Sequence, residues 1–140
     1  IIADSSQAIY DPPIFILGLL SSRIHNLWSN FVGGTLQTTP RYSIKLCYNT
    51  FPFNVTDKKY LTELEKESLN LIDEREKYSD KTLAQIYDPN QMPSSLKKRH
   101  EAIDSIIEDF YKINKNWDNE KKLSFVLDIY KNYKNVNQLI

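Results

Sequence analysis

The sequence predicts a mainly α-helical protein of the α+β class, in which a short strand-and-helix portion precedes a small helical bundle. The first observation is that apolar residues recur three and four positions apart in several stretches, as on the buried face of an amphipathic helix. The second is an uneven charge distribution. The chain has 18 Lys and Arg and 18 Asp and Glu residues, yet residues 1–56 contain only five of them.

Charge also divides the chain into two expected domains, residues 1–56 and residues 57–140. A stretch so poor in charge can hardly cover itself with solvated surface, so we expect the first domain to pack against protein that this sequence lacks. An opening of Ile1-Ile2 without a methionine fits a piece of a longer protein. The second domain has the pattern of self-sufficient amphipathic helices.

In the first domain, a short strand is predicted within Ile1–Tyr10, and Asp11 is placed to cap a helix that runs to about Phe31. Gly33-Gly34 ends this helix. A polar loop follows, and then Tyr42–Tyr48 alternates large apolar residues with smaller or polar ones, which is typical of a strand. The helix should bury Leu17, Leu20, Ile24, Leu27, Trp28 and Phe31.

In the second domain, Thr56 and Asp57 are both good caps for a long helix. A short helix over Lys81–Tyr87 comes next, another starts near Pro93, and Asp118 or Asn119 caps the last one. The stripes that should face inward are Leu61, Leu64, Leu71, Ile72 and Tyr78, then Leu96, Ile103, Ile106, Ile107, Phe110 and Ile113, then Leu123, Val126, Leu127, Tyr130 and Tyr133.

No catalytic machinery is evident in the sequence. Three glycines cannot make a dinucleotide fingerprint or a phosphate loop, and no serine nucleophile motif is present. The acid pairs Glu63/Glu67 and Glu108/Asp109 are expected on solvated outer faces of helices rather than in acid–base work. We therefore expect the chain itself to be non-catalytic.

Cofactor, metal and membrane binding have equally little support. Cys47, His25 and His100 are too few and too scattered for a zinc site, and a single cysteine indicates a reducing, cytoplasmic compartment. The apolar run at residues 14–20 is far shorter than the ~20 residues that cross a bilayer. Zero net charge predicts neither nucleic acid nor an anionic membrane as a partner of the whole surface.

One motif has two interpretations. Asp11-Pro12-Pro13 resembles the Asp/Asn-Pro-Pro-aromatic sequence with which amino-methyltransferases hold the target amine, but Ile14 replaces the aromatic residue and Phe15 comes one position late. No glycine-rich cofactor loop precedes it in this chain. We interpret these residues as the start of a helix.

Three ordered blocks carry a family resemblance. Each combines aromatic, polar and apolar residues. They are Gly18-Leu19-Leu20-Ser21-Ser22-Arg23-Ile24-His25-Asn26-Leu27-Trp28; then Gly34-Thr35-Leu36-Gln37-Thr38-Thr39-Pro40-Arg41-Tyr42-Ser43 with Tyr48-Asn49-Thr50-Phe51-Pro52-Phe53; and Thr82-Leu83-Ala84-Gln85-Ile86-Tyr87-Asp88-Pro89-Asn90-Gln91-Met92-Pro93 with Leu96-Lys97-Lys98 and His100-Glu101-Ala102-Ile103-Asp104.

Together the blocks resemble the end of the MmeI-like class of DNA adenine methyltransferases and fused restriction-modification enzymes, over roughly residues 5–115. The resemblance implies that residues 1–56 end a target recognition domain and that residues 57–140 form a carboxy-terminal helical domain. It also implies a bacterial parent enzyme whose upstream methyltransferase domain uses S-adenosylmethionine to methylate adenine N6. The partners would be that upstream domain and, through the parent, double-stranded DNA.

Matching the family pattern position by position points to Gln37, Thr39 and Arg41 as residues that read bases. Gln can pair bidentately with adenine and Arg with guanine, while Thr can serve either base or a methyl group. Further candidates for DNA contact are Ser5, Ser6 and Lys45.

Two departures from the pattern occur in the same loop. Thr35 stands where Arg is usual, and Pro40 stands where Tyr is usual and would stiffen the chain before Arg41. Two alternatives remain open for the candidate residues themselves. In one, Gln37 and Thr39 belong to an ordinary polar loop. In the other, Arg41 forms a structural ion pair with Asp4 or Asp11.

The competing function is a helical protein-interaction module that does not bind DNA and whose charge-poor beginning docks on a partner. The effect of Arg41 on sequence specificity discriminates between the two.

Overall fold

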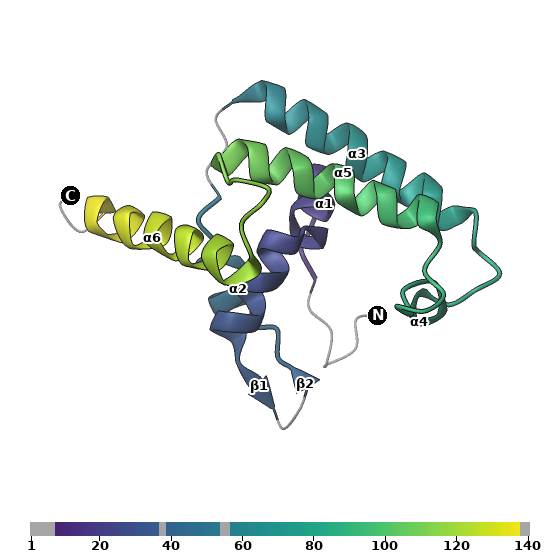
Figure 1. Cartoon of the computed structure of the whole chain (residues 1–140), viewed down its shortest axis with the longest axis horizontal. Coiled ribbons are helices and arrows are strands. Elements are labelled where there is room, and N and C mark those ends of the chain that lie inside the picture. The colour runs from purple at the N-terminus through teal and green to yellow at the C-terminus, as the bar shows by residue number, and fades with distance from the viewer. Residues whose placement is uncertain (1–7, 37–38, 54–56, 138–140) are drawn as a thin grey trace. The chain divides into compact units, whose positions relative to one another are not determined.

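The structure is a computed structural model, and it describes residues 8–36, 39–53 and 57–137 (Figure 1). The predicted fold class is confirmed, since the described chain is mainly helical. In chain order the elements are α1 (Phe15–Ser21), α2 (Arg23–Gly33), β1 (Thr35–Leu36), β2 (Thr39–Pro40), the π-helical turn η1 (Ile44–Tyr48), α3 (Lys58–Glu76), α4 (Leu83–Ile86), α5 (Ser94–Tyr111) and α6 (Asn119–Asn137).

Two compact units are present, and neither is continuous in sequence. The helical unit combines Ile14–Arg23 with Val55–Lys115. The hairpin unit takes its described residues from Ile1–Pro13, Ile24–Asn54 and Asn116–Ile140. This grouping follows spatial contact, so the predicted division into residues 1–56 and 57–140 stays a prediction.

The helical unit is built on α3 and α5, which lie side by side, with α1 against both (Figure 1). Its core is the set of leucines and isoleucines that the helical spacing predicts. Burying one such side chain stabilises the fold by about 1.5–3 kcal/mol. Gly18 lets α1 approach α3 closely, because a Cβ at this position would overlap the Ser68 hydroxyl and the Leu64 side chain. Fully buried here are Leu64, Leu71, Leu96, Ile103 and Ile107.

Helix ends in the helical unit are fixed by local side chains. Asp57 accepts a hydrogen bond from the Lys59 backbone N–H (2.9 Å), as predicted for the cap of α3. Thr82 and Gln85 form a reciprocal capping box at α4. Because the capping box fixes the first turn at Leu83, α4 is shorter than the helix predicted over 81–87.

In the hairpin unit, the core centres on Trp28 of α2, which is fully buried. The rings of Phe51 and Tyr130 meet Trp28 edge-on, with centroids 5.9 and 5.2 Å away. Helix α6 starts where predicted, with the Asp118 carboxylate accepting a hydrogen bond from the Lys121 N–H (2.8 Å). This unit is therefore held mainly by aromatic packing.

The single helix predicted from Asp11 to Phe31 is wrong, because the chain breaks at Ser22. The Ser22 backbone is extended and its hydroxyl donates to the Leu19 carbonyl (2.7 Å), an alternative to helical bonding that serine commonly offers. The Arg23 N–H that begins α2 instead donates to the Asp104 carboxylate (2.6 Å), 81 positions away in sequence.

Asp11 is not a helix cap. It adopts a φ of 45°, and α1 begins only at Phe15 without a side-chain cap. One reason is that Pro13 disfavours helical backbone at Pro12, so a helix cannot start directly after Asp11. Of the strand predicted within Ile1–Tyr10, residues 1–7 lie outside the described residues, and residues 8–10 form no strand.

The two predictions for the chain after Gly34 are also wrong. The β1–β2 hairpin is found where a polar loop was predicted, and η1 is found where the strand Tyr42–Tyr48 was predicted. The alternation over Tyr42–Tyr48 does not correspond to burial, because Cys47 is the buried residue whereas Leu46 is 49% exposed. The Cys47 sulfur accepts the Ser43 backbone N–H (3.3 Å), which closes the chain into a turn instead of leaving it extended.

Three side chains depart from their predicted environments. Phe31 and Tyr133, predicted to face inward, are 58% and 38% exposed, and each lies in the last turns of its helix. Glu108, predicted on a solvated face, is buried. It shares the buried arc of α5 with Asp104, Ile107 and Tyr111, which is wider than the apolar stripe alone.

Candidate nucleic-acid interface

The candidate base-reading residues surround a short antiparallel hairpin. Strand β1 pairs with β2 in the register Thr35↔Pro40 and Leu36↔Thr39. Gly34 leads into the hairpin with a φ of 65°, a conformation that glycine adopts without strain. The hairpin thus directs the chain out from the end of α2 and back again within six positions.

Arg41 follows β2 directly. Its backbone N–H donates to the Gly34 carbonyl (3.1 Å), which extends the hairpin pairing by one hydrogen bond, and its side chain is exposed. Within the described ranges, no carboxylate lies within 4 Å of the guanidinium, so the ion pair with Asp11 does not form. Asp4, the other suggested partner, lies outside those ranges.

The other candidates are described unevenly. Thr39 belongs to β2, and Lys45 is exposed in the first turn of η1. Gln37, Ser5 and Ser6 lie outside the described residues. The structure therefore brings Thr39, Arg41 and Lys45 into one continuous stretch of hairpin and turn, and their assignment to bases or phosphates stays a prediction.

Sequence reasoning missed the contact between His25 and Tyr42. His25 Nε2 lies 3.0 Å from the Tyr42 hydroxyl. The His25 ring also packs edge-to-face with the Phe51 ring, and the two ring centroids are 4.8 Å apart. Burial lowers the pKa of His25 to about 4, and burial with its neighbours raises the pKa of Tyr42 to about 12. Both side chains are therefore neutral near pH 7. Both lie in the resemblance blocks, but a lone histidine on an apolar helix face gave no sign of its partner.

Gly33 and Cys47 constrain the same segment from the side of α2. A Cβ at Gly33 would overlap the Arg41 carbonyl oxygen and stand 3.0 Å from Cys47 Sγ. The Cys47 sulfur in turn accepts the Ser43 N–H and lies 3.8 Å from the Ser29 carbonyl, which its S–H can reach. The backbone on both sides of the Arg41 side chain is thus packed against α2.

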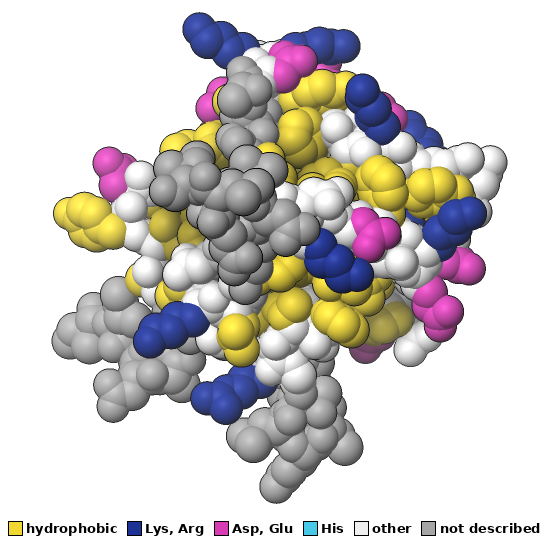
Figure 2. All heavy atoms as spheres, turned by 90° about the vertical axis from the view of Figure 1, so that its left-hand side faces the viewer, with side chains coloured by type: hydrophobic (Ala, Val, Ile, Leu, Met, Phe, Trp, Pro, Cys, Tyr) yellow, Lys and Arg dark blue, Asp and Glu magenta, His cyan; other side chains and the backbone are white. Residues whose placement is uncertain are grey.

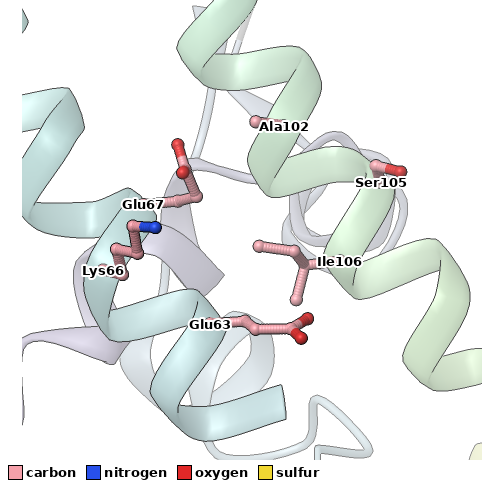
Figure 3. Close-up of a pocket in the computed structure, with 6 residues that line it drawn as sticks. All are labelled: Glu63, Lys66, Glu67, Ala102, Ser105 and Ile106. Atoms are coloured by element: carbon pink, nitrogen blue, oxygen red, sulfur yellow. The ribbon is translucent and has the colours of Figure 1, made fainter. Parts of the chain in front are cut away.

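A shallow groove between α3 and α5 is a weaker candidate for a site (Figure 3). Two of its polar groups are already engaged: Glu67 accepts from Arg99 (3.3 Å), and Ser105 accepts from Lys115 (2.7 Å). The groove is lined by Glu63, Lys66, Glu67, Ala102, Ser105 and Ile106.

The third resemblance block forms a structural cluster in the helical unit. The Tyr87 hydroxyl lies 2.8 Å from His100 Nε2 and accepts a hydrogen bond from Arg75 Nε (2.8 Å). Burial is the main cause that lowers the pKa of His100. The cluster ties the end of α4 to α3 and α5, so Tyr87 and His100 of this block have a structural role.

Other kinds of site find no support in the described part of the chain. No group of three or more His, Cys, Asp or Glu side chains there is arranged to hold a metal ion. None of the described helices is both long and apolar enough for a bilayer crossing. On the face in Figure 2, the described Lys and Arg side chains are separated by apolar and acidic ones, so they form no continuous basic surface there.

Comparisons with known proteins agree with this architecture. Residues 1–55 match the family model of the MmeI target recognition domain, and residues 55–138 match that of the MmeI C-terminal domain. DNA methyltransferase A of Bacillus subtilis (strain 168) is 39% identical over 130 residues, which are 93% of this chain and 15% of that protein.

A solved structure, that of the type IIL restriction-modification enzyme MmeI in complex with DNA, is similar with a TM-score of 0.85 at 33% identity. The similarity covers 89% of this chain and 17% of that one, so the chain spans less than a fifth of either relative. On the extent of these matches, the chain belongs to the MmeI family, with sequence of both its target recognition domain and its C-terminal domain.

Proposed function

We propose that this chain reads DNA sequence for a larger DNA adenine-N6 methyltransferase and has a non-catalytic scaffolding role in that enzyme. The observation that carries the proposal is Arg41, whose exposed guanidinium has no carboxylate partner among the described residues and whose backbone is fixed by Gly34. Arg is the commonest reader of guanine, through paired hydrogen bonds to O6 and N7. Membership of a family named for target recognition supports this role.

The division of labour follows from what this sequence contains. With three glycines and no nucleotide-binding loop, the chain does not fit S-adenosylmethionine, so an upstream methyltransferase domain would bind that cofactor. S-adenosylmethionine would supply the methyl group for adenine N6. Flipping the adenine out of the duplex would likewise belong to the upstream domain. A fused nuclease is compatible with the restriction-modification enzyme among the relatives. We place the parent enzyme in the cytoplasm.

Zero net charge is consistent with this role when the parent provides the phosphate contacts. Nonspecific DNA affinity comes mainly from phosphate neutralisation, whereas specificity comes from base-edge contacts. A neutral reader in a larger basic protein can therefore determine the sequence without supplying most of the affinity.

The test is Arg41→Ala in the full-length methyltransferase, assayed by methylation of a library of sites. We expect one base pair of the recognition sequence to become degenerate, with a loss of about 1–3 kcal/mol of discrimination there and no change elsewhere. Arg41→Lys should lose part of that discrimination, because Lys lacks the planar fork that makes two hydrogen bonds.

Lys45→Ala serves as the matched control, since Lys45 is an exposed cation four positions along the chain. If Lys45 binds a phosphate, its replacement by alanine should weaken DNA binding equally for every sequence and reduce the salt dependence of binding. An unaltered recognition sequence in Arg41→Ala would refute the assignment of Arg41 and would favour the protein-interaction module.

A further inference from the structure

The backbone around Arg41 is fixed to α2 on two sides. On one side, the Arg41 N–H donates to the Gly34 carbonyl (3.1 Å), and the Arg41 carbonyl packs where a Cβ of Gly33 would be. On the other side, the next residue, Tyr42, places its hydroxyl 3.0 Å from His25 Nε2. His25 is the third residue of α2 and Gly33 is its last, so the two attachments come from opposite ends of one helix.

From this arrangement we infer that His25 is a positioning residue for Arg41, acting through its hydrogen bond to Tyr42. Of His25, Tyr42 and Arg41, only Arg41 would contact the base. His25 fixes the Tyr42 side chain, and the fixed Tyr42 in turn limits the backbone rotations that would swing the preceding Arg41 side chain. This inference rests on the proposed function, because it assigns a helper to the proposed reading residue.

The environment of His25 suits a fixed contact. The ring is buried at 2% exposure, and the Phe51 ring meets it edge-on (4.8 Å), so it has little freedom to rotate. Tyr42 is 43% exposed, so its ring is much less enclosed than that of His25. The buried partner therefore fixes the exposed one.

Protonation does not disturb the contact near neutral pH. Burial lowers the pKa of His25 to about 4, so the ring is uncharged at pH 7. Tyr42, with a pKa raised to about 12, retains its proton. Whichever tautomer the neutral ring adopts, one of the two groups donates to the other.

Fixing Arg41 matters because a two-pronged contact is sensitive to small displacements. A guanidinium that becomes ordered only upon binding reduces the binding free energy by the entropic cost of ordering, which a pre-positioned guanidinium avoids. Recognition groups need their supporting contacts to hold them within about 0.5 Å of the productive geometry. A loosened Arg41 would still attract DNA, but it would discriminate less at its own base pair.

The experiment uses the full-length methyltransferase with the variants Tyr42→Phe, His25→Leu and His25→Gln. Tyr42→Phe removes only the hydroxyl and keeps the ring. His25→Leu removes the hydrogen-bonding atom from the α2 side, whereas the amide of His25→Gln reaches about as far as Nε2 and can still bond the hydroxyl. Methylation rates are compared between the cognate site and sites substituted at each base pair.

We expect Tyr42→Phe and His25→Leu to lower discrimination about two- to tenfold, the range of one lost hydrogen bond, at the base pair affected by Arg41→Ala. The other base pairs should keep their discrimination, and His25→Gln should restore most of the loss. In an Arg41→Ala background, Tyr42→Phe should have no further effect at that base pair. A thermal melt of each variant records any general loss of stability.

The outcomes separate the inference from the function on which it rests. If Arg41→Ala leaves every base pair unchanged, the proposed function fails and the inference fails with it. If Arg41→Ala relaxes one base pair while Tyr42→Phe and His25→Leu leave that base pair unchanged, or weaken all base pairs equally, only the positioning role of His25 is refuted.

Discussion

The helical unit and the hairpin unit are stabilised in different ways. In the helical unit, α1, α3 and α5 bury leucine and isoleucine side chains, and many charged side chains lie on the exposed faces, although Glu74, Asp104 and Glu108 are buried. In the hairpin unit, the segment Ile24–Asn54 contains only two charged residues, Arg41 and Lys45. It is held by ring-edge contacts, a buried thiol and backbone hydrogen bonds.

The two units constrain their side chains in different ways. Apolar burial is non-directional and tolerates exchange of similar side chains, so it gives stability without fixing single atoms. Hydrogen bonds and close backbone approaches fix directions, which a residue that reads base edges requires. We therefore expect substitutions in the helical unit to change stability and substitutions in the hairpin unit to change mainly sequence discrimination.

The largest expected effect is a core truncation in the helical unit. Leu71→Ala removes a fully buried side chain of α3 and should lower the free energy of unfolding by about 2–5 kcal/mol, from lost burial and the cavity left behind. Urea denaturation of the chain measures this change.

Leu69→Ala is the matched control, because the same substitution is made on the same helix at a side chain that is 52% exposed. It should change the free energy of unfolding by less than about 0.5 kcal/mol. Equal effects of the two variants would mean that α3 does not bury the face described here.

The sequence was sufficient to predict most of the helical unit. Leu64, Leu71, Leu96, Ile103 and Ile107 recur at helical spacing and are all buried. Caps lie within a few residues of the ends they serve, and burial on one helix face is periodic, so both can be recognised locally.

Prediction was poorest where distant residues determine the local structure. The break between α1 and α2 depends on Asp104, which lies 81 positions from Arg23. The turn η1 was missed for a different, local reason: the Cys47 sulfur accepts the N–H of Ser43, four positions away, and strand or helix propensities do not take such a contact into account. His25 and Tyr42 are 17 positions apart and lie on different elements, so only the fold brings them together. The base-reading residues themselves came from family resemblance rather than from any periodic pattern.

The second prediction concerns pH, and it tests how strongly the hairpin unit depends on one buried ring. The folded-state pKa of His25, about 4, lies below its ordinary value of 6.5. The unfolded chain therefore takes up a proton in this range that the folded chain does not, so stability falls as pH decreases from about 6.5 to about 4. At 1.36 kcal/mol per pH unit, the contribution of His25 approaches about 3 kcal/mol.

Urea denaturation at pH 7, 6, 5 and 4 measures this loss, with His25→Gln as the comparison. Because carboxylates titrate in both proteins, the difference between the two curves isolates His25. His100→Gln is the matched variant in the helical unit. Burial also lowers the pKa of His100, so His100 should likewise contribute stability that is lost as the pH falls. Parallel curves for the original chain and His25→Gln would contradict a buried neutral His25.

The smallest effect concerns Asp57 and Asp73, which lie at opposite ends of α3. Asp57 accepts a backbone N–H at the start of the helix, where the helix dipole also favours negative charge. Asp57→Ala should therefore lower the free energy of unfolding by about 1 kcal/mol.

Asp73 is exposed within the last turn of α3, where the dipole disfavours negative charge and where alanine has the higher helix propensity. Asp73→Ala should therefore raise the free energy of unfolding by about 0.5 kcal/mol. Both variants replace an aspartate by alanine, so opposite changes in the free energy of unfolding would reflect the position on the helix and not the side chain removed. Loss of stability in both would mean that α3 depends on contacts of Asp73 beyond its own helix, as the hairpin unit depends on His25.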